Sequence, residues 1–441
     1  MTTLAKLELA ILNPFQEELH LPQGSKNEID SNFYQENEPV AWYSRQRLVF
    51  EQTTVTDSKV RYTTPEGATF CLKSVMHQTL PAINVKQAYA DTVQICWTPY
   101  PAIACILSAE LKIDACEPMS FPSQWYDIQM QYFRKPNYTA QRLTRAGHVP
   151  ELVHWQKTLP EHACSLPQPF MYSRSSVDAL PLNLNHANKA ANVIQHIYTL
   201  RNKVSALLRM RRLKAEGGWE EIAVDTSYLD PCPMVLETPQ LWGVFTFNTS
   251  EEIDNYRCDK NGPGIVRYYE DVIHLTSTNS EELGKRMTRA LTECALPCRD
   301  IFWMCENTTA TENRCYSNYT TSADFPTADI NTHPIASSSL NYGSKKRFDQ
   351  LTNDHFDDEC EDIFPSPALD QGYCGLSFPT DMNHRIDVGV ILKELNANLN
   401  VNLRHDATCK DKFLLHVILL VSRKLTYRKD ESGRFLAELN D

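Results

Sequence analysis

The sequence is poor in glycine, with only 14 in 441 residues, and it contains no glycine-rich phosphate loop. Nucleotide-binding proteins hold phosphates on the backbone amides of such loops, so nucleotide chemistry lacks its usual binding element here. Basic charge is also scarce, because the net charge is −12 and one basic run stands out, RMRRLK at 209–214. Nucleic-acid binding needs clustered Lys and Arg. We therefore expect no direct nucleic-acid contact, and we interpret the run as a solvated connector between domains.

The chain also lacks a long hydrophobic run. The most apolar stretch, FLLHVILLVS at 413–422, has about half the length that a transmembrane helix needs and contains His416. We interpret it as a strand that is covered on both faces. The N-terminal MTTLAKLELAILNPF has no basic n-region, no uninterrupted apolar segment and no small-residue cleavage site, which predicts that no secretory signal is present. A cytosolic chain with reduced thiols is expected, with most of its 14 cysteines buried as small hydrophobes.

The length exceeds what one hydrophobic core usually serves, so two large domains are expected. A content of 42% hydrophobic and 22% charged residues is typical of folded globular proteins. The dominant local pattern has a period of two, which places alternate side chains on opposite faces of a sheet. The pattern predicts an all-β protein.

Two stretches show the alternation most clearly. In LSAELKID, one face is predicted to carry Leu107, Ala109, Leu111 and Ile113, and the other Ser108, Glu110, Lys112 and Asp114. In NANLNVNLR, at 396–404, the apolar face comprises Ala397, Leu399, Val401 and Leu403. The segments 69–80 and 385–392 follow the same pattern.

Other segments depart from this pattern. The apolar residues of AANVIQHIYTLRNKVSALLRM have a spacing that favours an amphipathic helix, and we leave this segment unresolved. The stretch 306–344 is dominated by Ser, Thr, Asn and Pro, which predicts a long surface loop that the protein presents outward. A second loop-rich stretch is expected at 134–169. Many strands and long Pro-rich loops in halves of roughly 200 residues favour jelly rolls over the smaller immunoglobulin domains.

Candidate chemical sites are few. The stretch DHFDDECED offers possible ligands of a divalent ion, but it has no glycine where an EF-hand loop requires one, so a solvated acidic loop is favoured. These possible ligands are Asp354, His355, Asp357, Asp358, Glu359 and Cys360. Gaps of three, six and nine residues separate four clustered cysteines and match no zinc spacing, which favours buried thiols beside Ile301, Phe302 and Trp303. They are Cys294, Cys298, Cys305 and Cys315.

The stretch GYCGLSF, at 372–378, superficially resembles the nucleophile loop of a cysteine hydrolase. With 14 cysteines and 13 histidines, however, Cys–His pairings arise freely. We therefore predict no catalytic residue, no metal ligand and no cofactor, and we expect that the chain is not an enzyme. Sequons at Asn137, Asn248, Asn307 and Asn318 are candidate glycosylation sites, although without a secretory signal chance matches are favoured.

Four stretches, spread in order over about 200 residues, resemble landmarks of the major capsid proteins of nucleo-cytoplasmic large DNA viruses. The first, 96–133, has a strand at 107–113 and then an aromatic-rich helix with Trp125, Tyr126 and Ile128. The second has an aromatic and an arginine ahead of ALPL, here Phe170, Tyr172, Arg174 and 179–182. The third is AVDTSYLD at 223–230, and the fourth is CRDIFWMCEN at 298–307.

The resemblance implies a tandem double jelly roll, with two eight-stranded β-sandwiches side by side, long surface loops and a few short helices. The expected parts are an N-terminal arm at 1–45, a first jelly roll at 46–215 and a second at 216–441. The alternating leucines around Pro181 fit a strand start or a sheet edge, where the missing N–H costs no ladder bond. Leu180, Leu182 and Leu184 would then face the interior of the first sandwich.

In function, the resemblance implies a structural subunit of an icosahedral capsid that forms homotrimeric, pseudo-hexagonal capsomers. Its implied partners are neighbouring capsomers, minor capsid and penton proteins, and an internal lipid membrane near the N-terminal arm. The implied location is the virion, after assembly in the host cytoplasm. The alternatives are a minor capsid or scaffolding protein of the same lineage and a carbohydrate-binding protein built on jelly rolls.

Overall fold

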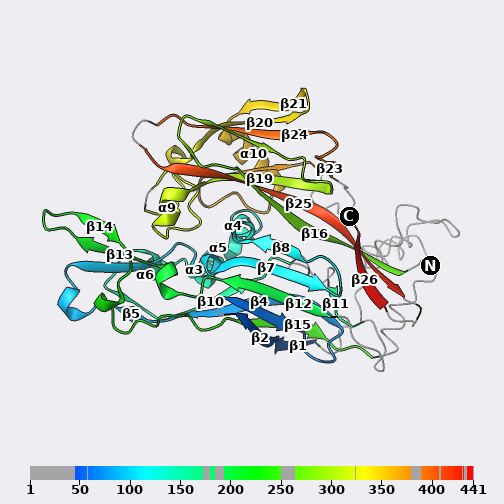
Figure 1. The fold of residues 1–441 in the computed structure, drawn as a ribbon, viewed down its shortest axis with the longest axis horizontal. Helices are drawn as coiled ribbons and strands as arrows, with labels where there is room; N and C mark the ends of the chain where they lie inside the picture. The colour runs from blue at the N-terminus through cyan, green and yellow to red at the C-terminus, as the bar shows by residue number, and fades with distance from the viewer. Residues whose placement is uncertain are drawn as a thin grey trace, which may run out of the picture.

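The computed structural model describes residues 45–56, 58–170, 172, 179–183, 193–249, 264–322, 324–378, 389–406, 409–429, 431 and 435–440. In this part of the chain, two groups of β-sheets follow one another, and they form the lower and upper bodies of Figure 1. The expected N-terminal arm lies outside the described residues, apart from Arg45. Among the residues described, no helix has the length and apolar character needed to span a bilayer.

The first sandwich has two main sheets and two small ones. One main sheet has the order β1 (Arg45–Val49), β15 (Gln240–Thr246), β4 (Phe70–Leu80) and β10 (His162–Pro167), and β11 (Leu180–Pro181) also pairs with β4. The other has the order β2 (Glu51–Thr56), β3 (Lys59–Thr63), β12 (Ile194–Leu200), β7 (Ile106–Ile113) and β8 (Met119–Pro122). The small sheets are β14 (Trp219–Ile222), β13 (Leu208–Leu213) and β6 (Val93–Trp97), and β5 (Ile83–Asn84) with β9 (Thr158–Leu159).

The second sandwich packs two sheets around a core of its own. One has the order β16 (Gly264–Thr276), β25 (Lys412–Lys429), β19 (Pro297–Asn307) and β22 (Tyr373–Ser377), to which β17 (Glu281–Glu282), β23 (Val390–Ile391) and β26 (Phe435–Asn440) add short pairings. The other has the order β18 (Arg286–Ala290), β24 (Ala397–Leu403), β20 (Ile335–Tyr342) and β21 (Lys345–Leu351).

The helices are short and connect the strands. The Pro-rich stretch 134–169, expected to be loop-rich, contains several of them, because Pro136 and Pro150 occupy the first position of a helix, where the missing N–H leaves no bond unmade. The helices are α3 (Pro101–Ala104), α4 (Ser123–Gln131), α5 (Thr139–Arg145), α6 (Pro150–Val153), α7 (Val204–Leu207), α9 (Thr308–Glu312), α10 (Asn353–Ile363), η2 (Gln87–Tyr89), η3 (Pro136–Tyr138), η6 (Thr226–Tyr228) and η7 (Ile330–Thr332).

Strand pairing corrects the boundary that the sequence placed at residue 215. β14 pairs with β13, and β15 pairs with both β1 and β4, so residues 219–246 complete the sheets of the first sandwich. The second group of sheets begins with β16, at Gly264. A resemblance to landmark motifs could not locate this boundary, because β15 returns across the first sandwich to fill a gap between two strands much earlier in the sequence.

The period-two predictions are largely confirmed. In β24, the four predicted apolar residues are all buried, with exposed fractions of 0–4%. In β7, Ala109, Leu111 and Ile113 are buried as predicted, but Leu107 is 38% exposed. The cause is a bulge opposite Thr199 and Leu200, which places Ile106 on the inner face instead.

The apolar run 413–422 forms part of β25 and is covered on both faces, as predicted. Val417, Leu419 and Val421 belong to the core between the two sheets of the second sandwich. Ile418 and Leu420 belong to the large core cluster that is formed mainly by the first sandwich. One strand therefore contributes to two cores, which explains why its sequence shows no polar side apart from His416.

Pro181 lies in β11, whose only pairing among the described strands is with β4. Leu180 and Leu182 are 1% and 2% exposed, which confirms that they face the interior, and Leu184 lies outside the described residues. A sheet edge tolerates proline because the N–H that it lacks would point away from the partner strand.

Two further segments are settled by the structure. The stretch 190–210, which the sequence leaves unresolved because its spacing favours a helix, contains β12, a single turn of α7 and the start of β13, since the sheet contacts of its β-branched residues override its helical periodicity. The acidic stretch DHFDDECED is not a loop but most of helix α10. Phe356 and Cys360, four residues apart, are buried on one side of this helix, while Asp354 and Asp358 face solvent.

Replacing Gly372 with alanine should unfold the second sandwich or strongly destabilise it. Gly372 has a φ of +99°, and a Cβ there would overlap the backbone oxygen of Tyr319. Gly217 is the matched control, because it has a φ of +88° but no atom lies within 4 Å of where a Cβ would be. Gly217→Ala should cost only about 1 kcal/mol of conformational strain. Urea unfolding of both variants checks this, and equal losses of stability would contradict it.

Candidate functional site

The region with the most unusual side-chain chemistry lies where the two sandwiches meet, and we refer to it as the junction. Its centre is an aromatic cluster between α4 of the first sandwich and β19 of the second. The Phe302 ring lies 6.2 Å from Trp125, 5.5 Å from Tyr132 and 5.2 Å from Phe364, between ring centroids. Figure 1 shows α4 between the two bodies. Trp125, Tyr126 and Ile128 lie in this helix, as the resemblance implied, and all three are buried.

The low-complexity stretch 306–344 is not the outward-facing loop that its composition suggested. Residues 315–322 fold back against the first sandwich, and Tyr319 is 2% exposed. The Tyr316 amide donates to Thr98 Oγ1 at 3.2 Å, and the guanidinium of Arg201 lies 4.2 Å from the centre of the Tyr316 ring. Within residues 315–322, Asn318 and Thr320 are 0% exposed, so polar residues of this part of the stretch are buried, and composition alone cannot distinguish a buried polar segment from a solvated loop.

The basic run 209–214 is likewise not a solvated connector. It forms β13, and Arg209 is 1% exposed. Its guanidinium donates to the backbone oxygen of Asp324 at 2.6 Å, forms an ion pair with Glu221, and lies about 5 Å from the ring centres of Trp155 and Phe325. A buried arginine is stable only when its charge is paired in this way. Arg209 therefore fixes residues 324–325 to the first sandwich.

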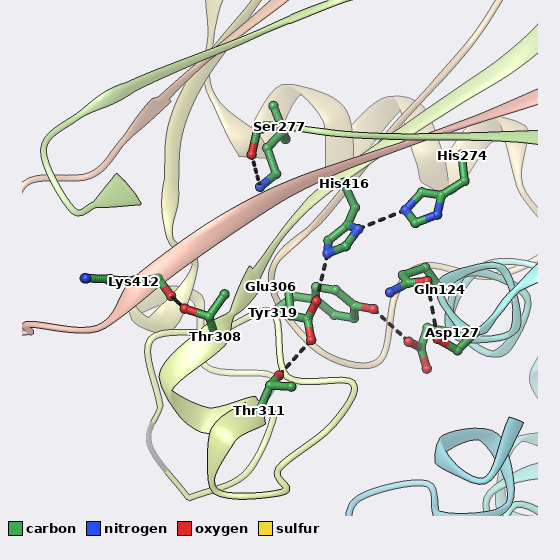
Figure 2. Close-up of polar contacts among 12 residues, drawn as sticks. Gln124, Asp127, His274, Ser277, Glu306, Thr308, Thr311, Tyr319, Lys412 and His416 are labelled. Atoms are coloured by element: carbon green, nitrogen blue, oxygen red, sulfur yellow. Dashed lines mark hydrogen bonds and ion pairs between the residues drawn. The ribbon is translucent and has the colours of Figure 1, made fainter. Parts of the chain in front are cut away.

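Asp127 of α4 is a buried carboxyl group at the junction, with 4% exposure. Its Oδ2 accepts a hydrogen bond from the Tyr319 hydroxyl at 2.8 Å, as Figure 2 shows. Burial raises the pKa of Asp127 to about 7, although hydrogen bonds from Ser317 and Tyr319 act in the opposite direction. The junction thus contains a carboxyl group that gains or loses its proton near neutral pH.

A second polar chain crosses the sheet of the second sandwich. His416 of β25 lies between two partners in Figure 2, with its Nε2 2.7 Å from Glu306 Oε2 and its Nδ1 2.9 Å from His274 Nε2. The Thr311 hydroxyl donates to the other oxygen of Glu306 at 2.7 Å. The two imidazole rings stack at 5.1 Å between centroids.

The ionisation of this chain follows from its burial and its partners. Burial acts to raise the pKa of Glu306, but the hydrogen bonds from His416 and Thr311 and the charge of His416 together lower it. Burial, followed by the nearby charge of His416, lowers the pKa of His274 to about 4. Glu306 is therefore a carboxylate that accepts from His416. In this way β16, β25 and β19 are joined by side chains as well as by their backbone ladder.

The end of α4 holds another segment of the second sandwich. Asp370 Oδ2 accepts from Tyr100 at 2.6 Å and from Gln131 Nε2 at 3.0 Å, and Gln131 Oε1 accepts from the Asp370 amide at 3.1 Å. Arg134 donates to the backbone oxygen of Pro367 at 2.6 Å, and the Ser366 hydroxyl donates to the Arg134 oxygen at 2.8 Å. The segment 366–370 both donates hydrogen bonds to the first sandwich and accepts hydrogen bonds from it. These bonds fix the segment in position.

The C-terminal strand adds a contact far from α4. The Ala437 amide of β26 donates to Asp114 Oδ2 at 3.1 Å, and the Cys116 thiol lies 3.3 Å from the Ala437 oxygen. The hydroxyl of Tyr427 lies 3.4 Å from the backbone oxygen of Pro181. The junction therefore extends along one side of the first sandwich, and this geometry opposes a hinge motion between the two bodies.

The loop GYCGLSF does bring a cysteine near a histidine, but not in a reactive arrangement. Cys374 Sγ lies 3.9 Å from His333 Nε2 and 3.6 Å from Asn353 Oδ1. Burial raises the pKa of the Cys374 thiol well above its usual value and lowers the pKa of His333 to about 4. A nucleophilic cysteine needs a thiolate and access for its substrate, whereas Cys374 and His333 are 1% and 2% exposed.

The clustered cysteines are buried, as the sequence predicted. Cys298 and Cys305 lie on β19, whereas Cys315 lies beside Asp324, whose backbone oxygen is 3.1 Å from its Sγ. Within the described residues, no group of three or more His, Cys, Asp or Glu side chains is placed to hold a metal ion.

The four sequons differ in accessibility. Asn137 is exposed in η3, while Asn248 is half-buried and accepts hydrogen bonds from Thr69 and Thr246. Asn307 and Asn318 are 0% exposed, and their side-chain amides donate to Thr320 and Ser322 oxygens. The folded chain thus shields these last two amides from solvent. Glycosylation of Asn137 and Asn248 stays a prediction.

The residues that organise the junction carry only a weak signal in the sequence. His416 stands there as an interruption in an apolar run, and Asp127 stands between aromatic residues in SQWYDIQMQ. A polar residue inside an apolar pattern is usually buried with a partner. This signal marks Asp127 and His416 as candidates, although it cannot name Tyr319 or Glu306 as their partners.

Comparison with known proteins identifies the fold. No family model and no curated protein matches the chain. Among solved structures, the Faustovirus major capsid protein matches with a TM-score of 0.68 and 10% identity, over 96% of this chain and 97% of that chain. The PBCV-1 virus capsid matches with a TM-score of 0.65 and 12% identity, over 90% of this chain and 97% of that chain. The Sputnik virophage structure matches with a TM-score of 0.52 and 9% identity, over 96% and 92%.

These likenesses show that the chain has the double jelly-roll fold found in viral capsid proteins, as the sequence landmarks implied. The junction is then the contact between the two jelly rolls. Its aromatic cluster and the bonds of Asp127 and Asp370 fix the two bodies in one arrangement.

Removing the carboxylate of Glu306 should destabilise the protein by about 3–5 kcal/mol, because Glu306→Ala leaves Nε2 of the buried His416 without its carboxylate partner. Glu293→Ala is the matched control, since Glu293 is 59% exposed and forms an ion pair with Arg289 at 2.5 Å. An exposed pair contributes less than about 1 kcal/mol. Chemical unfolding of both variants at one pH tests this, and a loss for Glu306→Ala no greater than the control would contradict it.

The pH dependence of stability should contain a contribution from Asp127. Its folded-state pKa of about 7 exceeds the usual 3.8, so the unfolded chain releases this proton first as the pH rises. The contribution of protonated Asp127 to the free energy of unfolding is therefore fully present below about pH 4 and is lost progressively as the pH rises to about 7. Between pH 4 and pH 8, the free energy of unfolding of Asp127→Asn should therefore rise by up to about 4 kcal/mol relative to that of the native protein.

Unfolding free energies at a series of pH values measure this difference. The exposed Asp358→Asn is the control and should reproduce the native profile. A constant difference between Asp127→Asn and the native protein at all pH values would show that Asp127 does not titrate in this range.

Proposed function

We propose that the protein is a structural subunit of an icosahedral viral capsid, in which three copies form a pseudo-hexagonal capsomer. The observation that carries this proposal is the match to the Faustovirus major capsid protein over 96% of this chain and 97% of that chain. A match of this extent includes both sandwiches and their relative placement. The PBCV-1 capsid match supports the same function.

The junction supports the proposal on physical grounds. A subunit that provides two of six similar corners must hold its two bodies at a fixed angle, because an error of angle in each copy would accumulate around the ring. Aromatic packing at Phe302, the buried Arg209 and the bonds of Asp370 all restrain this angle. The buried polar groups are engaged with one another rather than arranged around a substrate, so the proposed role is not enzymatic.

The proposal also covers the location of the protein and its partners. The protein would be part of the virion after assembly in the host cytoplasm, with neighbouring capsomers, minor capsid and penton proteins, and an internal membrane as its partners. It would not contact nucleic acid directly, since its net charge of −12 opposes association with a polyanion.

The mass of the purified protein in solution tests this proposal. One chain has a mass of 50.5 kDa, so light scattering after size-exclusion chromatography should give about three times that mass. Negative-stain images should show particles with a pseudo-sixfold outline. A monomer or dimer that binds a glycan saturably would overturn the proposal and favour a carbohydrate-binding jelly-roll protein instead.

A further inference from the structure

The sheet β1-β15-β4-β10 has one face in the core of the first sandwich and one outward face with an unusual composition. Strand register places every second residue of each strand on this outward face. Among the described positions none is Asp or Glu, although the chain as a whole is acidic. The residues are Arg47, Val49, Lys73, Val75, His77, Thr79, Ala163, Ser165, Pro167, Gln240, Trp242 and Val244.

An arginine is held against aromatic rings on this face. The guanidinium of Arg47 lies 5.3 Å from the centre of the Trp242 ring, and one of its nitrogens lies 3.1 Å from His77 Nε2. Burial, followed by the charge of Arg47, lowers the pKa of His77. Neutral His77 accepts from Arg47, which holds the guanidinium beside the Trp242 ring.

Further positive charges lie around this group. Helix α5 packs beside β10 and carries Arg142 and Arg145 in its last turn. Burial and then the charges of Arg142, Arg145 and Arg47 lower the pKa of Lys73. Four cations therefore repel one another at this face, and the groups that act on Lys73 include no carboxylate. Such repulsion is relieved when an anionic surface binds.

Charge is divided unequally between the two sandwiches. Residues 45–249 contain 20 Lys and Arg against 17 Asp and Glu, a net charge of +3. Residues 264–441 contain 19 against 27, a net charge of −8. The second half of the chain is thus opposite in net charge to the first half, and its acidic charge complements the basic face of the first sandwich.

The apolar content of the face favours a protein partner. Val49 is 40% exposed, and Val75, Trp242 and Val244 lie beside it in register. Trp and Arg are enriched in the centres of protein interfaces, where apolar area is combined with a few directional contacts. A polyanion or an anionic membrane would instead be repelled by the net charge of −12 at longer range.

We infer that the basic outward face around Arg47, Lys73 and Trp242 is the surface by which the first sandwich of one copy docks onto the acidic second sandwich of the next copy. This inference rests on the proposed function and identifies the contact that closes the ring. The contact is heterologous, since two different surfaces meet, and three such contacts in succession give a closed trimer. Electrostatic complementarity favours a contact between the first sandwich of one copy and the second sandwich of the next. It disfavours a contact between the first sandwiches of two copies, because their charges have the same sign.

Reversing two exposed charges on this face tests the inference. Lys73→Glu combined with Arg145→Glu should raise the concentration at which trimers dissociate by at least tenfold, as measured by mass photometry over a dilution series. Lys203→Glu combined with Lys214→Glu is the matched control, because both lysines are exposed on the same sandwich but outside this face, and it should change that concentration less than twofold. Unfolding curves should show that both variants fold.

Salt and cross-linking give independent readouts. Raising NaCl from about 0.05 M to 0.5 M should weaken assembly of the native protein, because salt screens attraction between charged surfaces. In trimers assembled from a mixture of ¹⁴N- and ¹⁵N-labelled chains, a carbodiimide should join Lys73 to a carboxylate of residues 264–441 in a different copy.

The docking surface and the proposed function are refuted by different results. If the native protein is trimeric but the Lys73→Glu, Arg145→Glu variant dissociates like the control, or if Lys73 is cross-linked only within its own copy, the docking surface is wrong and the proposed function stands. If the native protein is monomeric at every concentration, the proposed function fails and this inference fails with it.

Discussion

The architecture depends on the middle of the sheet β16-β25-β19-β22, where residues of β25 and β19 are buried on both faces, each face against a different body. One face closes the core of the second sandwich, and the other packs against α4 of the first. An antiparallel sheet usually keeps one face in water. Here neither face is free, so the second sandwich cannot separate from the first without exposing Phe302, Ile418 and Leu420. The two bodies therefore behave as a single folded unit.

Polar groups give this apolar contact its specificity. Apolar surfaces can slide over one another at small cost, whereas a buried carboxyl group or guanidinium has a large free-energy cost unless its partner is in place. Asp127 with Tyr319, Arg209 with the backbone oxygen of Asp324, and Asp370 with Tyr100 each admit one relative position of the elements that carry them. The aromatic cluster buries apolar area between the sandwiches, and these pairs determine how the two bodies are aligned.

The sequence predicted the parts of the fold that depend on local patterns. Strands with clean alternation, such as β24, were predicted residue by residue, because one side of each strand faces a core and the other does not. The short helix after β7 and the edge position of Pro181 were also predicted. The errors arose where distant residues determine the outcome: β15 returns to the first sandwich, the stretch 315–322 is buried by contacts with the other half, and Arg209 is buried by Trp155 and Phe325. A period or a composition does not report contacts between residues more than 100 positions apart.

The position of β25 in the chain has a consequence for biosynthesis. β25 lies between β16 and β19 in the sheet, and the bond between His274 and His416 joins residues that are 142 positions apart. A ribosome needs roughly ten seconds to add that many residues. During this interval β16 and β19 have been made but lack the strand that separates them, so each nascent chain exposes two long strand edges. On a polysome, where many copies emerge close together, such edges can pair with those of a neighbour, and a chaperone that shields them until β25 emerges would increase the yield of folded protein.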